Sequence, residues 1–128
     1  MLGVGAVDCA IHVLNATINR NGSGPVRRAG CTIIGTVVAT PETREELYRI
    51  LMAQVPPTRA EAGCVSYDFH CDNADPNVFV FYENFVDRDA LELHLKKPYL
   101  QQLFGRIDEL LAKPVDLRFL DMLSDLAI

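Results

Sequence analysis

The sequence predicts an α+β protein with a ferredoxin-like βαββαβ fold, in which a four-stranded antiparallel sheet carries helices on one face. Strand-like segments and segments with helical spacing follow one another in the order strand, helix, strand, strand, helix, strand. A chain of 128 residues with 49% hydrophobic residues is long enough to bury one core without disulfides or metals. One folded domain is therefore expected.

The first 30 residues differ in character from the rest. Residues 19–25 (NRNGSGP) gather turn formers, and the stretch before them, residues 10–18, is predicted either as an extra strand or as unstructured chain. This part carries three arginines and one aspartate, a net charge of +2. Because the whole chain has a net charge of −5, the remainder has a net charge of −7. We divide the chain into an N-terminal extension, residues 1–30, and a folded domain, residues 31–128.

The domain is predicted to begin with a strand and a helix. Residues 31–39 (CTIIGTVVA) are apolar and β-branched, which is typical of a strand buried on both faces. Thr40 is the predicted N-cap of the helix and Pro41 its first residue. The helix has one apolar stripe, formed by Leu47, Ile50, Leu51 and Val55. Pro56-Pro57 is expected to break it or kink it sharply.

The next two elements are predicted as a β-hairpin. Residues 64–71 (CVSYDFHC) alternate apolar and polar side chains, and residues 78–85 (VFVFYENF) form an almost wholly apolar strand at their start. The turn-forming segment DNADPN joins them. An antiparallel pairing follows from the short connection.

The remaining segment is predicted as two helices and a last strand. Asp87 is a suitable N-cap for a helix that reaches Leu95, and Pro98 separates it from a second helical stretch with strict apolar spacing. Pro114 ends the helical region, and residues 115–123 alternate well enough for a fourth strand. Because helices then cover one face only, and the first and third strands are apolar on both sides, we expect a homodimer packed through the open sheet face.

Composition excludes several classes of partner. The net charge of −5, with no extended basic stripe, disfavours nucleic acid. No apolar run reaches the roughly 18 residues that a membrane span needs, and no basic, apolar leader opens the chain, so a cytoplasmic protein without a membrane partner is expected. The four cysteines contain no C-x-x-C pair and are interpreted as reduced thiols, with no metal site.

Three stretches resemble the antibiotic biosynthesis monooxygenase family in their order and spacing. Residues 59–64 (RAEAGC) resemble its R-x-E-x-G-C bend, and Tyr67 stands at its usual tyrosine. Residues 82–94, from YENF to His94, resemble its Y-E-x-W-x-D-x-x-A-L-x-x-H signature. The resemblance covers about residues 31–123 and implies a ferredoxin-like domain that pairs into a dimeric α/β barrel.

The resemblance implies several activities. Similar proteins include monooxygenases of phenols and quinols, haem-degrading proteins, isomerases of small carbonyl compounds, and members without known substrate. We expect a monooxygenase that uses molecular oxygen on a small aromatic, phenolic or quinol-like compound and needs no cofactor, neither flavin nor metal, because the substrate anion can itself reduce oxygen. An isomerase of a small carbonyl compound, or a non-enzymatic dimeric ligand-binding or stress protein, is the alternative.

Two positions bear on haem chemistry. Phe85 stands where many family members have tryptophan, and Phe104 aligns with the histidine that ligates iron in the haem-degrading relatives. A phenyl ring cannot ligate iron. The resemblance therefore disfavours haem degradation.

His94 and Glu83 are the predicted catalytic residues. His94 lies three residues after Leu91 on the helical stripe, so it points toward the sheet as a candidate base, or else as a core histidine with one hydrogen bond. Glu83 shares strand parity with aromatic residues, where burial raises the pKa of a carboxyl unless it is paired. The alternative for Glu83 is a structural pair with Arg59 or a dimer contact.

Four aromatic residues are the predicted substrate-binding set. Tyr67 and Tyr99 could present hydroxyls to a bound anion, and Phe81 and Phe85 could form an aromatic wall. The alternative for the tyrosines is a place in the core or the interface. His70 falls on the polar parity of its strand and is interpreted as a surface or interface residue.

Overall fold

The computed structural model describes residues 28–127, so most of the extension, residues 1–27, lies outside the described part together with the strand predicted there. The elements follow the predicted order. They are β1 (Cys31–Val38), α2 (Arg44–Arg59), β2 (Cys64–Cys71), β3 (Val78–Phe85), α3 (Arg88–Leu95), α4 (Pro98–Leu110) and β4 (Asp116–Leu120).

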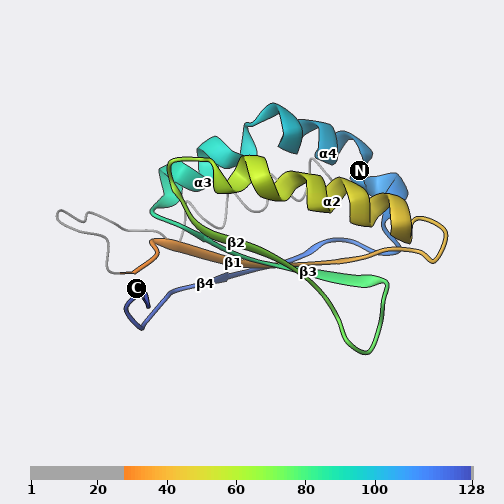
Figure 1. Cartoon of the computed structure of the whole chain (residues 1–128), viewed down its shortest axis with the longest axis horizontal. Coiled ribbons are helices and arrows are strands. Elements are labelled where there is room, and N and C mark those ends of the chain that lie inside the picture. Colours follow the sequence, from red (N-terminus) through yellow and green to blue (C-terminus); the bar gives the residue numbers. More distant parts are fainter. Residues whose placement is uncertain (1–27, 128) are drawn as a thin grey trace.

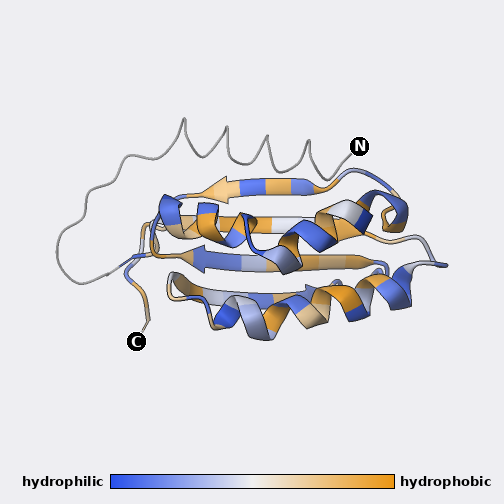
Figure 2. Ribbon diagram, turned by 90° about the horizontal axis from the view of Figure 1, so that it is seen from above, coloured by the Kyte–Doolittle hydropathy of each residue, from blue (hydrophilic) through white to orange (hydrophobic). Residues whose placement is uncertain are grey.

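The four strands form one antiparallel sheet in the order β2-β3-β1-β4. All three helices lie on the same side of it (Figure 1). Seen from above, the helices lie over the β2, β3 and β1 part of the sheet, and β4 lies beside them (Figure 2). This is the ferredoxin-like arrangement that the sequence predicts.

The strand register places two rows of side chains under the helices. Glu83 of β3 pairs with Tyr67 of β2 on one side and with Ile33 of β1 on the other. The next row toward α4 contains Phe81 and, beside it on β1, Gly35. Because side chains alternate between the faces of a strand, both rows point to the helical side.

The core fills the layer between these rows and the helices. Its larger cluster joins β1, β2 and β3 to α2 and α4, and Leu47 and Phe79 in it are fully buried. A smaller cluster joins the start of β1 to Phe85 and to Leu91 of α3. Burial of such side chains stabilises the fold by about 2 kcal/mol each.

The helix α2 differs from its prediction at both ends. It begins at Arg44 rather than at Pro41, and its N-cap is Thr43 rather than Thr40, because Thr40 and Thr43 bond to each other in a preceding turn, with Thr43 N–H donating to Thr40 Oγ1 at 3.1 Å. It continues through Pro56 and Pro57 to Arg59, so the predicted break is wrong. The prolines fall in the last turn, and Thr58 beside them is fully buried, so packing outweighs the lost backbone bonds.

The C-terminal half agrees more closely with its prediction. Asp87 caps α3 by accepting a hydrogen bond from Ala90 N–H at 2.8 Å, and Pro98 opens α4 as expected. The fourth strand ends at Leu120 rather than at residue 123. Beyond it the chain turns to the start of β1, where Met122 Sδ accepts a hydrogen bond from the Ala29 N–H.

The open face of the sheet combines an apolar centre with a polar margin. On the central strands, Ile34 pairs with Tyr82, and Val38 pairs with Val78. Asp68 and His70 of β2 and Arg118 of β4 occupy the same face on the outer strands. One end is polar: Thr32 Oγ1 donates to Asn84 Oδ1 at 2.6 Å, and Asn84 Nδ2 donates to Ser66 Oγ at 2.9 Å.

Candidate active site

A cavity of about 100 Å³ lies between the helical face of the sheet and the helices α3 and α4. Its walls are almost wholly aliphatic and aromatic, and the few polar side chains among the lining residues are Tyr67, Glu83 and His94. Gly35 contributes to the space because it has no side chain at the point where the sheet faces α4. A mostly apolar pocket with a few convergent polar groups is the usual form of a small-molecule site.

His94 reaches the cavity from α3 and is held from behind by a carboxylate. Its Nδ1 lies 2.9 Å from Oε2 of Glu61, in the turn between α2 and β2, and the hydroxyl of Tyr99 donates to the same oxygen. A carboxylate only accepts hydrogen bonds, so Nδ1 carries the proton and Nε2 is left with its lone pair. This tautomer is the one that a general base requires.

Burial sets the protonation state of His94. The imidazole is 2% exposed, and desolvation lowers its pKa below the usual value, although the hydrogen bond to Glu61 acts in the opposite direction. Lys97 lowers it further. The ring is therefore neutral at pH 7 and can accept a proton.

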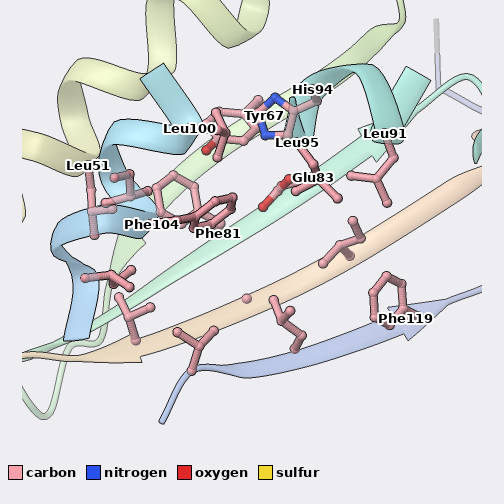
Figure 3. A pocket seen from close by; sticks show the side chains of 17 residues that line it. Leu51, Tyr67, Phe81, Glu83, Leu91, His94, Leu95, Leu100, Phe104 and Phe119 are labelled. Atoms are coloured by element: carbon pink, nitrogen blue, oxygen red, sulfur yellow. The ribbon is translucent and has the colours of Figure 1, made fainter. Parts of the chain in front are cut away.

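Glu83 lies on the sheet side of the same cavity. Figure 3 shows Glu83 and His94 directed into one space, with Phe81 and Phe104 beside them. Burial, assisted by the negative charge of Glu61, raises the pKa of the Glu83 carboxyl to about 8. The pairing with Arg59 that the sequence left open is not formed, since Arg59 donates instead to Asp68 Oδ1 at 2.9 Å and to the Tyr67 carbonyl oxygen.

The aromatic residues around the cavity divide into two groups. Tyr67 and Phe81 line it and pack against each other with ring centroids 5.0 Å apart. Tyr67 also meets His94 edge to face, and burial raises the pKa of its hydroxyl. Phe104 is a further lining residue.

Phe85 and Tyr99 have other places than those predicted for them. Phe85 is fully buried and packs under the imidazole of His94, with centroids 5.1 Å apart, rather than lining the cavity. Tyr99 points to Glu61, and burial together with this hydrogen bond raises the pKa of its hydroxyl. Both residues therefore support His94 in the structure and do not border the cavity.

The sequence reasoning missed Glu61 and Gly35. Glu61 lies in the R-x-E-x-G-C stretch, but no local pattern indicates that its carboxylate meets a histidine 33 residues later in the chain. Gly35 stands inside a strand, where an isolated glycine is a signal of close approach or of space for a ligand. Such a signal was available for Gly35 and not for Glu61.

No group of three or more histidine, cysteine and acidic side chains that could hold a metal ion occurs in residues 28–127. Within the same residues, no helix combines the length and the apolarity that crossing a membrane takes.

The fold and the cavity define a ferredoxin-like α+β protein with a mostly apolar site between sheet and helices. The sequence model of the family described as antibiotic biosynthesis monooxygenase matches residues 31–106. The chain belongs to this family. The resemblance found in the sequence is thereby confirmed.

Relatives and solved structures agree with the family. An uncharacterised protein of Synechocystis is 33% identical over 67% of this chain, which spans 58% of that protein's length. Rv0793 of Mycobacterium tuberculosis, which has a provisional monooxygenase name, is 34% identical over 73% of this chain and 91% of its own.

The structure of PA3566 from Pseudomonas aeruginosa superposes with a TM-score of 0.73 at 36% identity, over 79% of this chain and 100% of that one. The structure of Rv0793 gives a TM-score of 0.72 at 31% identity, over 76% of this chain and 98% of that one.

Proposed function

We propose that the protein is a cofactor-independent monooxygenase of a small aromatic, phenolic or quinol-like compound. The observation that carries this proposal is the neutral His94, which lines an apolar cavity while Glu61 fixes its Nδ1 and leaves Nε2 with its lone pair. A base in a dry pocket converts a bound hydroxyl into an electron-rich anion that can reduce oxygen directly. The family and the monooxygenase name of Rv0793 support the same reaction type.

The reaction balances without an added reductant. A hydroquinone and one O₂ give a hydroxyquinone and one water, so the substrate supplies all the electrons. His94 takes the hydroxyl proton, a carbon–oxygen bond forms between the anion and O₂, and the oxygen–oxygen bond then breaks as the second oxygen leaves as water. The proton held by His94 returns to that departing oxygen, and the ring carbon that has gained oxygen loses its hydrogen as the second proton of the water.

Oxygen uptake by metal-free protein, measured with a panel of phenols and quinols, tests the proposal. We expect uptake that depends on substrate, and a loss of at least about 100-fold in His94→Ala, since a positioned general base contributes about 10² to 10⁴ in rate. Leu93→Ala is the matched control, because Leu93 lies on the same helix and is 62% exposed. Uptake that is as fast in His94→Ala as in the wild type would refute the mechanism.

The alternatives give different results in the same experiment. An isomerase would convert a carbonyl compound without oxygen, so turnover under argon that persists at the aerobic rate would replace the monooxygenase proposal. One non-enzymatic alternative is a protein whose pocket is filled by its own side chains. The cavity beside His94 disfavours it. A ligand-binding protein would bind phenols but consume no oxygen.

We also propose that two copies pair through the open sheet face. The centre of that face is mostly apolar, with Thr36 opposite Val80, and its outer strands are charged, which is the pattern of an interface core with a polar rim. Val80, in the centre, is the residue to change: Val80→Lys should give a monomer in light scattering after gel filtration, and Leu93→Lys, on the helical side, should leave a dimer. A wild-type monomer would refute this pairing.

A further inference from the structure

Glu83 is a carboxyl group without a partner in an apolar cavity. It projects from the middle of β3 between Tyr67 and Ile33, and no described residue donates a hydrogen bond or offers an ion pair to its carboxyl. Glu83 is half-buried, and a carboxyl without a partner in an apolar site is costly, so a fold would be more stable with an apolar residue there. The cost is understandable if the missing partner is a ligand.

Among residues 28–127, the groups that face Glu83 do not include a cation. From β2 come Tyr67 and Cys64, from the turn after α2 comes Glu61, and from α3 comes His94. The lining residues from α4, β1 and β4 are all apolar. The surroundings therefore favour the protonated carboxyl, and the pKa of about 8 agrees with this. At pH 7 Glu83 has a proton to donate.

We propose that Glu83 is a hydrogen-bond donor to the ligand, and that the site selects rings with two oxygens: a hydroxyl that faces His94 and a second oxygen that accepts from Glu83. The two residues then have opposite roles, since Nε2 of His94 accepts a proton and Glu83 donates one. This inference rests on the proposed function only in taking the cavity as the substrate site.

The second oxygen needs only to accept a hydrogen bond. A protonated carboxyl can donate its hydrogen bond to a carbonyl, a hydroxyl or an ether oxygen of the ligand. An ionised carboxylate only accepts hydrogen bonds, so it would require a hydroxyl on the ligand. The distinction can be measured with small single rings. The cavity is of the same order as the roughly 150 Å³ engineered cavity that holds benzene.

Calorimetric binding of three probes under argon tests the proposal. Hydroquinone, 4-methoxyphenol and 4-methylphenol share the hydroxyl for His94 and differ at the opposite position. We expect the two oxygen-bearing probes to bind about tenfold more tightly than 4-methylphenol, the effect of one buried hydrogen bond. Tight binding of hydroquinone alone would mean that Glu83 accepts rather than donates, and equal or absent binding of all three would also overturn the proposal.

Two variants separate the role of Glu83 from a structural one. Glu83→Gln keeps an N–H donor and should keep the preference, while Glu83→Leu should remove it and bind 4-methylphenol at least as well as the wild type. Binding of 4-methoxyphenol to the wild type should weaken as the pH rises through about 8 and level off about tenfold weaker, the effect of the lost hydrogen bond, and binding to Glu83→Gln should not. A preference that survives in Glu83→Leu, or a wild-type affinity that is flat from pH 7 to 9.5, would contradict the proposal.

The result is independent of oxygen chemistry. Binding under argon does not require that the protein consume oxygen, so the preference can hold where oxygen uptake is absent. Conversely, oxygen uptake that persists while the three probes bind alike would refute the role of Glu83 and leave the monooxygenase proposal intact.

Discussion

The two carboxyl groups nearest His94 lie in contrasting environments. Glu61, in the turn before β2, accepts hydrogen bonds from Nδ1 of His94 and from the hydroxyl of Tyr99. Glu83, on the central strand β3, receives none from the described residues. The side chain of Glu61 is only 8% exposed and Glu83 is half-buried, so exposure to water does not explain why Glu61 is the one with partners.

The difference lies in which elements meet each group. The turn after α2 brings Glu61 to the junction between the end of α3 and the start of α4. Each of these helices contributes one donor, His94 from α3 and Tyr99 from α4. Glu83 is covered by the apolar side of α4. Glu61 therefore positions the base, whereas Glu83 retains bonding capacity for a ligand. The following variants test this contrast.

Removing Glu61 should have the largest effect. Glu61→Leu leaves the buried Nδ1–H of His94 and the hydroxyl of Tyr99 without their acceptor, which should lower the free energy of unfolding by about 3 kcal/mol. Urea unfolding measures the change. Glu61→Gln should recover part of it, because an amide oxygen still accepts one bond.

Glu109→Gln is the matched control for Glu61. Glu109 pairs with Arg106 on the surface, and such pairs contribute less than about 1 kcal/mol. If Glu61→Leu cost no more than Glu109→Gln, the view that Glu61 anchors His94 would be wrong.

Replacing the ionisable carboxyl of Glu83 should raise the free energy of unfolding, whereas Glu61→Leu should lower it. The carboxyl ionises near pH 4.5 in the unfolded chain but only near pH 8 in the folded protein, so the unfolded state loses its proton first. Wild-type stability should therefore fall as the pH rises from about 4.5 to about 8. Glu83→Gln should lack this loss and be more stable than the wild type by a few kcal/mol at pH 8, with little difference at pH 4.5.

Urea unfolding of both proteins at the two pH values checks the prediction. His94 also contributes to the pH dependence of stability, but in the opposite direction. Because its pKa is lowered, its contribution to stability is lost as the pH falls through the pKa of an ordinary histidine. Both proteins retain His94, so their difference cancels this effect. A difference that does not grow between pH 4.5 and pH 8 would show that Glu83 is ionised in the folded state.

The elements of the fold were predictable because each has a local signal. The cap Asp87, the breaker Pro98 and the alternation of residues 64–71 each fix one boundary from neighbouring residues alone. The break predicted at Pro56-Pro57 was wrong because the free-energy cost of a proline is smaller near the end of a helix than in its interior. That cost also depends on what the last turn packs against. That contact is tertiary.

The site was predictable only where strand or helix parity decides direction. Parity placed Glu83, Phe81 and His94 on the cavity side correctly. It also placed Phe85 on the helical face, but whether a residue on that face lines a cavity depends on the position of α3, which packs His94 over Phe85. The role of Glu61 depends on three segments meeting, and no pattern within one segment carries that information.

Gly35 offers the smallest and most local test of the contrast. A Cβ at Gly35 would lie 3.4 Å from Leu117 Cδ2, an ordinary contact, so Gly35→Ala should change the free energy of unfolding by less than about 1 kcal/mol. It should nevertheless weaken binding of 4-methoxyphenol severalfold, because the new methyl group occupies cavity space close to Glu83 and leaves the bonds of Glu61 intact. Gly105→Ala, on α4 with no atom within 4 Å of the added Cβ, should stabilise by about 0.5–1 kcal/mol and leave binding unchanged. Equal binding to both variants would place the ligand away from Gly35 and so away from the Glu83 side of the cavity.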